Sequence, residues 1–195
     1  QKNTNATINE SLKRIEEVSK LAQKNNVKIR GYISTVFGCP YEGKTSVNEF
    51  IRLAKILKEF GAYEISIGDT IGIANPLQVK DFLETVLKQF KSSDFAMHFH
   101  DTRGMALANI LTSLEFGITS FDSSSAGLGG CPYAKGASGN VATEDLVNFF
   151  HSIGIDTGIE MDKLAMASRF ILEKIKSDGQ SKFLKAYLGE KNKGV

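Results

Sequence analysis

The chain alternates between helical and strand-like segments, and this alternation limits its possible folds more than any other feature. After a first helical segment at 7–26, four strand segments are each followed by a helical one. The strands are expected at 27–36, 62–67, 95–100 and 118–123, and the following helices at 45–60, 76–90, 104–116 and 141–153, with a further helix at about 160–176. Such an order predicts an α/β fold with a parallel sheet covered by helices.

The strand segments carry polar residues on one face and apolar residues on the other. The polar set is Arg30, Tyr32, Ser34, Glu64, Ser66, His98 and His100, and the apolar set includes Ile29, Ile33, Ile65, Ile67, Phe95 and Met97. A polar face with a period of two in a parallel sheet favours the interior of a barrel over an open sheet.

A closed (β/α)8 barrel needs about 250 residues, whereas this chain has 195 residues and four strand segments. We therefore expect residues 1–177 to be the C-terminal part of one TIM-barrel catalytic domain, about four βα units with extra helices. The N-terminal half of the barrel would precede them. The segment 178–195 is expected to be a polar, loose tail.

Composition excludes several classes of protein. The net charge of +2 is too small to indicate nucleic-acid binding or a membrane surface. No apolar run approaches the roughly 18 residues of a membrane-spanning helix. With only two cysteines, Cys39 and Cys131, a disulfide scaffold is not expected, and both thiols are predicted to be free.

The stretch GCPYEGKT at 38–45 matches the Walker A pattern, so a P-loop that binds a nucleotide through Gly38 to Thr45 is one hypothesis. Pro40 has no N–H to offer a phosphate, and Glu42 would add negative charge beside it. The tetrapeptide GCPY returns at 130–133, which favours two turns after strands at the same end of the sheet. In this interpretation Cys39 is structural.

The stretch HFHDTRG places His98 and His100 two residues apart at the end of a strand. Both side chains then point to the same side, and two neutral imidazoles make half of a divalent-metal site. The alternative is a pair of buried, hydrogen-bonded histidines. Asp101 is a candidate for a further ligand, for a partner that supports the ligands or for the cap of the next helix, and the last two roles are favoured.

The stretch GDTIG places Asp69 at the same end of the sheet, where a carboxylate acts as a base or fixes the substrate. An aspartate at this position also caps a turn through its own backbone. The spacing alone leaves both interpretations open.

The segment SSSAGLGGCPYAKGASGN is too long and too rich in glycine for an ordinary connection, and it predicts a mobile lid over an active site. Gly127, Gly129 and Gly130 lie in this lid loop. Cys131 within it is a candidate nucleophile or proton donor. Asn140 either caps the next helix or offers its side-chain oxygen to a metal.

Taken together, GCPYEGK, YEISIGDTIG, HFHDTRGMALAN and the cysteine-bearing loop resemble the hydroxymethylglutaryl-CoA lyase family, within the superfamily of metal-dependent lyases and Claisen-condensing (β/α)8 enzymes. The similarity runs from about residue 1 to 165. Related condensing synthases share the His-x-His pattern and a Gly-Asn, but not GLGGCPY. A related Claisen-type acyl-CoA enzyme and a non-catalytic paralogue are the alternatives within the superfamily.

The resemblance implies that His98, His100 and Asn140 bind Mg²⁺ or Mn²⁺. It also implies that Cys131 is the catalytic cysteine and Asp69 a catalytic acid residue. The implied reaction is the cleavage of 3-hydroxy-3-methylglutaryl-CoA to acetyl-CoA and acetoacetate. His98 or Asp69 would act as the base, and Cys131 would protonate the enolate.

Further implications of the resemblance concern the whole protein. The resemblance implies an acyl-CoA substrate, and we expect a homodimer that resides in the cytoplasm or the mitochondrial matrix. The family's aspartate ligand on the first strand, its neighbouring arginine and a glutamate on the second strand have no counterparts in this sequence.

Overall fold

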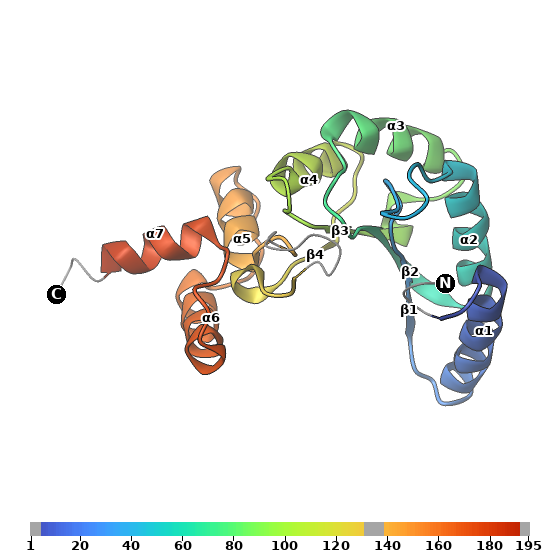
Figure 1. Ribbon diagram of the computed structural model, residues 1–195, viewed down its shortest axis with the longest axis horizontal. Helices are drawn as coiled ribbons and strands as arrows, with labels where there is room; N and C mark the ends of the chain where they lie inside the picture. Colours follow the sequence, from blue (N-terminus) through green and yellow to red (C-terminus); the bar gives the residue numbers. More distant parts are fainter. Residues whose placement is uncertain (1–4, 131–138, 192–195) are drawn as a thin grey trace.

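The computed structural model describes residues 5–130 and 139–191, and its strands form one parallel sheet (Figure 1). Within these residues the sheet has four strands, in the order β1-β2-β3-β4. Their bounds are Ile29–Ile33 for β1, Ala62–Asp69 for β2, Phe95–Phe99 for β3 and Phe121–Asp122 for β4. The predicted α/β fold with a parallel sheet is confirmed, and its arrangement is that of a partial, TIM-barrel-like domain.

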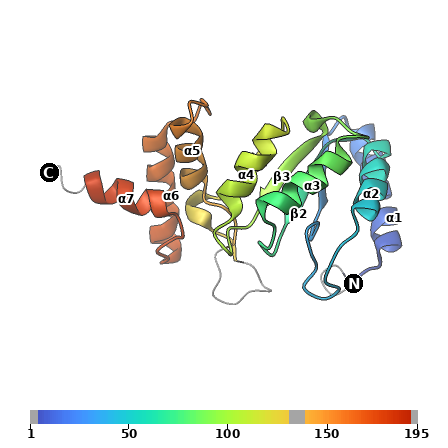
Figure 2. The ribbon, with the colours of Figure 1, turned by 90° about the horizontal axis from the view of Figure 1, so that it is seen from above.

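Helices follow the strands as the alternation predicts. They are α1 (Ile8–Lys24), α2 (Val47–Glu59), α3 (Pro76–Val86), α4 (Ala106–Glu115), α5 (Thr143–Ser152), α6 (Met161–Ile175) and α7 (Lys182–Lys191), with 3₁₀ turns η1 (Ser92–Asp94) and η2 (Ser125–Gly127). In Figures 1 and 2, α1 to α4 follow one another along one side of the sheet, and α5 to α7 lie beyond β4. None of the helices described here combines the length and apolar character that crossing a bilayer requires.

The hydrophobic core lies between the sheet and the helices α2, α3 and α4. Ile65, Ile67 and Met97, on the apolar faces of β2 and β3, are completely buried, as are Val79 and Leu83 of α3. Burial of each such side chain stabilises the fold by roughly 1.5–3 kcal/mol. One face of each strand is thereby fixed against the helices, so the alternate residues point to the opposite side of the sheet.

The first helix also forms as the sequence predicts, and Thr7 caps it in a reciprocal arrangement with Glu10. Its apolar stripe, however, is not buried against the described residues. Val18 and Leu21 are each 63% exposed. The periodicity of the apolar residues therefore identified the helix, but these residues are not buried against another described element.

Two elements are shorter than expected. The strand expected at 118–123 pairs with β3 only at Phe121 and Asp122. It lies at an edge of the described sheet, where β3 is its one neighbouring strand, so fewer backbone hydrogen bonds support a longer strand. The helix expected at 76–90 ends at Val86 and continues as turns.

The described part of the C-terminal segment, 178–191, is not a loose tail, and for these residues the expectation was wrong. It contains α7, whose Leu184 is 3% exposed and packs with Ala126 and Ala165. Asp145 of α5 holds the start of α7, because its Oδ1 accepts hydrogen bonds from Ser181 Oγ at 2.7 Å and from the backbone N–H of Phe183 at 2.8 Å. The stabilising contacts are tertiary, so local periodicity does not reveal them.

These contacts lead to a prediction for Asp145→Ala. The change removes the acceptor for the first N–H groups of α7 and should destabilise its docking by about 1–2 kcal/mol. Hydrogen exchange should become faster across 182–191, while β2 and β3 keep their protection. Glu173→Ala, which removes only an exposed ion pair with Arg169, is the matched control and should change little. Equal exchange in α7 for both variants would contradict this account.

Candidate active site

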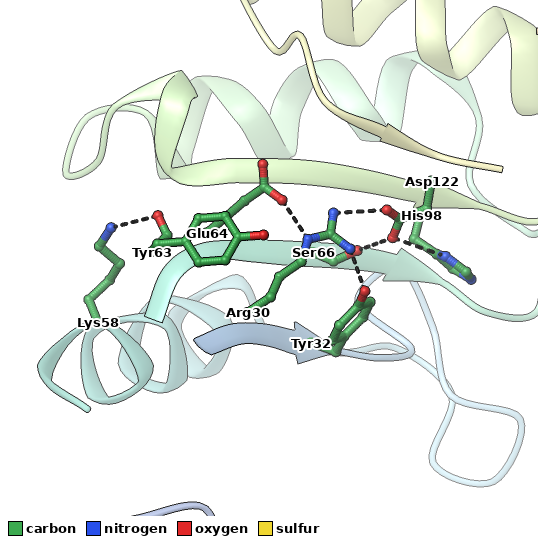
Figure 3. Close-up of polar contacts among 8 residues, drawn as sticks. All are labelled: Arg30, Tyr32, Lys58, Tyr63, Glu64, Ser66, His98 and Asp122. Atoms are coloured by element: carbon green, nitrogen blue, oxygen red, sulfur yellow. Dashed lines mark hydrogen bonds and ion pairs between the residues drawn. The ribbon is translucent and has the colours of Figure 1, made fainter. Parts of the chain in front are cut away.

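The polar face of the sheet carries a continuous network of charged side chains centred on Arg30 (Figure 3). Arg30 Nε lies 2.5 Å from Glu64 Oε1, and Arg30 Nη2 lies 2.8 Å from Asp122 Oδ1. Arg30 Nη1 also donates to the Tyr32 hydroxyl. Strands β1, β2 and β4 are thus connected through one guanidinium, and the side chains of Arg30, Glu64 and Asp122 are only 16–21% exposed.

Asp122 extends this network to the predicted metal ligands. Its Oδ2 accepts a hydrogen bond from Ser66 Oγ at 2.7 Å and lies 3.3 Å from His98 Nδ1. Burial alone would raise the pKa of Asp122, but its hydrogen bonds with His98, Arg30 and Ser66 hold that pKa well below its ordinary value. The register explains the contact, because His98 of β3 lies directly opposite Asp122 of β4.

The two predicted histidine ligands lie next to each other. The ring centroids of His98 and His100 are 5.2 Å apart. His100 Nδ1 is buried and has no hydrogen-bond partner among the described residues. Burial, together with the neighbouring His98, lowers the pKa of His100 to about 4, so its imidazole is neutral at physiological pH.

Asn140 joins the histidine pair from the far end of the glycine-rich loop. Its backbone forms an isolated antiparallel bridge with His100, and its Nδ2 donates to the carbonyl of Leu128 at 3.0 Å. A side chain at Gly129 would meet Asn140 Nδ2 at 2.6 Å, and the φ of +100° at Gly129 also favours glycine. His98, Asn140 and Asp122 line one open hollow on this face, together with Tyr32 and Ser124.

The donor set fits a divalent cation. Within the described residues no cluster of three or more His, Cys, Asp and Glu side chains has a metal-binding arrangement. The predicted set is of another composition, namely two imidazoles and an amide. The unpartnered Nδ1 of His100 is a buried polar atom that a bound cation would satisfy. Imidazole nitrogens and an amide oxygen are donors that divalent cations accept.

Asp69 lies at the carboxyl end of β2, but its contacts are structural. Its two carboxylate oxygens accept the backbone N–H groups of Ile73 and Ala74, each at 3.0 Å, and the residue is only 1% exposed. Burial raises the pKa of Asp69 despite these hydrogen bonds. These contacts are those of an aspartate capping a turn, and its catalytic role stays a prediction.

Asp101 and the lid loop follow the histidine pair in the sequence, and both were predicted to belong to the site. Asp101 Oδ1 accepts the N–H of Ala106, the first residue of α4, at 3.0 Å, and so satisfies an N–H group at the start of this helix, whose N-cap position is Met105. Gly127 lies in η2 with a φ of +69°, and Gly130 is the last described residue before the gap. Cys131 lies outside the described residues, so its role and that of the lid stay predictions.

The stretch GCPYEGKT folds as a closed turn. Cys39 and Gly43 exchange backbone hydrogen bonds at 2.8 and 2.9 Å, and the N–H of Gly38 donates to the carbonyl of Thr35 at 3.2 Å. Thr45 Oγ1 donates to the carbonyl of Val36. The N–H groups of both pattern glycines are thus engaged by nearby carbonyls, those of Thr35 and Cys39, whereas a P-loop directs successive N–H groups at phosphate. The geometry argues against the nucleotide hypothesis.

Comparison with known proteins agrees with this geometry. A family model described as HMGL-like matches residues 1–171. The chain belongs to the HMGL-like family. This confirms the resemblance found in the sequence motifs.

Relatives of this HMGL-like chain include solved structures. A mitochondrial hydroxymethylglutaryl-CoA lyase of Bos taurus is 49% identical over 186 residues, which cover 95% of this chain and 57% of the relative. A crystal structure of HMG-CoA lyase from Bacillus subtilis has a TM-score of 0.93 at 49% identity, covering 95% of this chain and 62% of that one.

A structure of an HMG-CoA lyase from Acinetobacter baumannii, in complex with coenzyme A and 3-methylmalate, has a TM-score of 0.87 at 40% identity and covers 94% of this chain and 60% of that one. The HMGL-like chain spans about half the length of the curated relatives it matches.

Sequence reasoning missed Asp122 as part of this site. The segment ITSFDS was identified only as a strand, although alternation from Ser120 places Asp122 on the polar face. The signal was the same period of two that identified His98 and His100. Arg30, Glu64 and Ser66 were expected on the polar face, but their joint contact with Asp122 was not.

The closed turn at 38–45 gives a prediction about nucleotides. Neither ATP nor GTP should bind with micromolar affinity in isothermal titration calorimetry, and Lys44→Ala should leave the titrations unchanged. Saturable micromolar binding that Lys44→Ala abolishes would show that a P-loop is present.

The pKa of His100 predicts an acid-dependent loss of stability. The folded-state pKa of about 4 lies below the ordinary value of 6.5, so the unfolded chain binds more protons between these values. The contribution of His100 is therefore complete above pH 6.5 and is lost as the pH falls towards 4. Asp122 loses its contribution to stability at lower pH, as the pH falls below its ordinary pKa of 3.8.

His100→Phe should accordingly flatten the dependence of the unfolding free energy on pH between 6.5 and 4, by up to about 1.4 kcal/mol per pH unit. Urea titrations at several pH values without added metal measure this slope. An unchanged slope would mean that His100 protonates normally in the folded protein.

Proposed function

We propose that this chain is the C-terminal part of a (β/α)8 catalytic domain that cleaves 3-hydroxy-3-methylglutaryl-CoA to acetyl-CoA and acetoacetate. One observation carries the proposal: His98, His100 and Asn140 gather at the carboxyl ends of the strands in a chain of the HMGL-like family. Active sites of such barrels lie at this end of the sheet.

The half-barrel part of the proposal has its own support. The described sheet ends at β1 and β4, and the helices α1 to α4 follow one another along one side of it (Figure 1). The apolar stripe of α1, with Val18 and Leu21, is exposed beside β1. Further strands and helices of a closed barrel would cover the edges of the sheet and this stripe. The boundary at 177, a homodimer, and a cytoplasmic or mitochondrial location stay predictions.

The residues that would hold Mg²⁺ or Mn²⁺ are His98, His100 and Asn140. When bound, the cation supplies Lewis acidity that lowers the pKa of the tertiary hydroxyl of the substrate. The low pKa of His100 keeps its ring neutral, with a nitrogen lone pair that can bind the cation. The acyl-CoA substrate is supported by the Acinetobacter baumannii relative, whose structure contains coenzyme A and 3-methylmalate.

The chain's own side chains would move two protons. His98 or Asp69 takes the proton of the C3 hydroxyl, the C2–C3 bond breaks, and C3 becomes the keto carbon of acetoacetate. The electron pair of that bond remains on the thioester fragment as an enolate. Cys131 then donates a proton to C2 of this enolate, which yields acetyl-CoA. Because His98 would hold the cation, Asp69 is the candidate that remains for the first proton, although its two oxygens also accept backbone N–H groups.

The test compares two cysteines in the intact protein with Mg²⁺ or Mn²⁺ present. Release of acetoacetate from the substrate should fall by about 10²–10⁴ in Cys131→Ala, which removes the proton donor, with Mn²⁺ affinity unchanged. Cys39→Ala is the matched control and should retain turnover, because Cys39 belongs to the closed turn. Absence of acetoacetate release from the unaltered protein, or equal losses in both variants, would refute the proposal.

A further inference from the structure

The charged network of Figure 3 ends at one of the proposed metal ligands. Asp122 faces two different partners with its two oxygens, because Oδ1 lies 2.8 Å from Arg30 Nη2 and Oδ2 lies 3.3 Å from His98 Nδ1. The carboxylate therefore lies between a permanent cation and the imidazole. It does not itself belong to the ligand set described above.

We propose that Asp122 is a positioning residue that accepts the Nδ1 proton of His98 and so selects the tautomer with its lone pair on Nε2. This inference deepens the proposed function. It rests on that function only for what His98 Nε2 does, which is to bind the cation or to accept a proton from the substrate. The tautomer itself is a property of the protein without metal.

The orientation of the Asp122 carboxylate is fixed by two neighbours, Arg30 and Ser66. Arg30 holds Oδ1, and Arg30 is itself held by Glu64 at 2.5 Å. Ser66 Oγ donates to Oδ2 at 2.7 Å. Rotation of the carboxyl group would give up the charged contact with Arg30, which hydrogen bonds to neutral groups do not replace. Oδ2 is therefore kept in place as an acceptor facing the His98 ring.

The tautomer decides which roles His98 can have. A neutral imidazole with a proton on Nδ1 has one lone pair, on Nε2. His98 then binds a cation or accepts a proton from the substrate, but not both at once. A hydrogen bond from the second nitrogen to a carboxylate also orients a ligating ring and raises its basicity, and loss of such a partner typically weakens metal affinity by about 10–100-fold.

Asp122→Asn provides a sharp test, because Arg30 dictates the orientation of the new amide. The guanidinium offers only donors, so the amide oxygen must face Arg30 and the amide NH₂ must take the place of Oδ2. The NH₂ group would then donate towards His98 Nδ1 and select the opposite tautomer, with the proton on Nε2. A nearly isosteric change is thus expected to reverse the ring's protonation pattern.

The experiment uses the intact protein labelled with ¹⁵N-histidine and freed of metal. Long-range ¹H–¹⁵N correlation spectra at pH 7.5 should show the proton of His98 on Nδ1. In Asp122→Asn the proton should be on Nε2. Ser66→Ala is the matched control, since it removes a bond to the same oxygen without touching His98, and it should leave the proton on Nδ1.

Mn²⁺ binding, followed by electron paramagnetic resonance, measures the consequence. The dissociation constant should rise about 10–100-fold in Asp122→Asn and less than threefold in Ser66→Ala. A proton on Nε2 in the unaltered protein, or on Nδ1 in Asp122→Asn, overturns the proposal, as does an unchanged Mn²⁺ affinity in that variant. The spectrum of the unaltered protein decides the tautomer even where a variant does not fold.

Failure of this inference differs from failure of the proposed function. A protein that shows the Nδ1 tautomer but releases no acetoacetate supports Asp122 as the positioning residue and refutes the lyase. Acetoacetate release with the proton of His98 on Nε2 supports the lyase and refutes the role of Asp122.

Discussion

The ion pair between Arg30 and Asp122 is the contact on which the inner face of this sheet depends. A partly buried guanidinium is tolerated only when carboxylates pair with it and its other N–H groups find acceptors. Here Glu64, Asp122 and Tyr32 supply those acceptors from β1, β2 and β4. Burial alone would lower the pKa of Arg30, yet these hydrogen bonds raise it above its ordinary value, so the charge is permanent. Any rearrangement of one strand would leave a charge unpaired.

This constraint also explains where the candidate site lies. The helices bury the apolar face of β2 and β3, so His98 must lie on the same side as Arg30 and Asp122. The parallel register then brings the ends of the strands together, and the backbone bridge between His100 and Asn140 adds the end of the glycine-rich loop. The proposed metal ligands and the charged network are therefore two parts of one surface, joined at the contact between Asp122 and His98.

Much of this could be predicted from the sequence, because it depends on local periodicity. Alternation of two kinds of segment predicts the parallel sheet, and a period of two predicts that His98 and His100 share a face. Contacts between distant segments were beyond such reasoning. Helix α7 depends on Asp145, 36 residues before Ser181. Alternation from Ser120 places Asp122 on the polar face, but it does not reveal the contacts of Asp122 with Arg30 and His98. For Asp69 the sequence left two roles open, since capping a turn and catalysis require the same residue type at the same place.

The central claim is that His98, His100 and Asn140 hold the divalent cation of a lyase, and anomalous diffraction from crystals of the intact protein grown with Mn²⁺ tests it most directly. The account predicts one strong manganese peak with an imidazole nitrogen of both histidines and the side-chain oxygen of Asn140 at roughly 2.0–2.3 Å. A manganese peak elsewhere, or one that contacts neither histidine, would contradict the account.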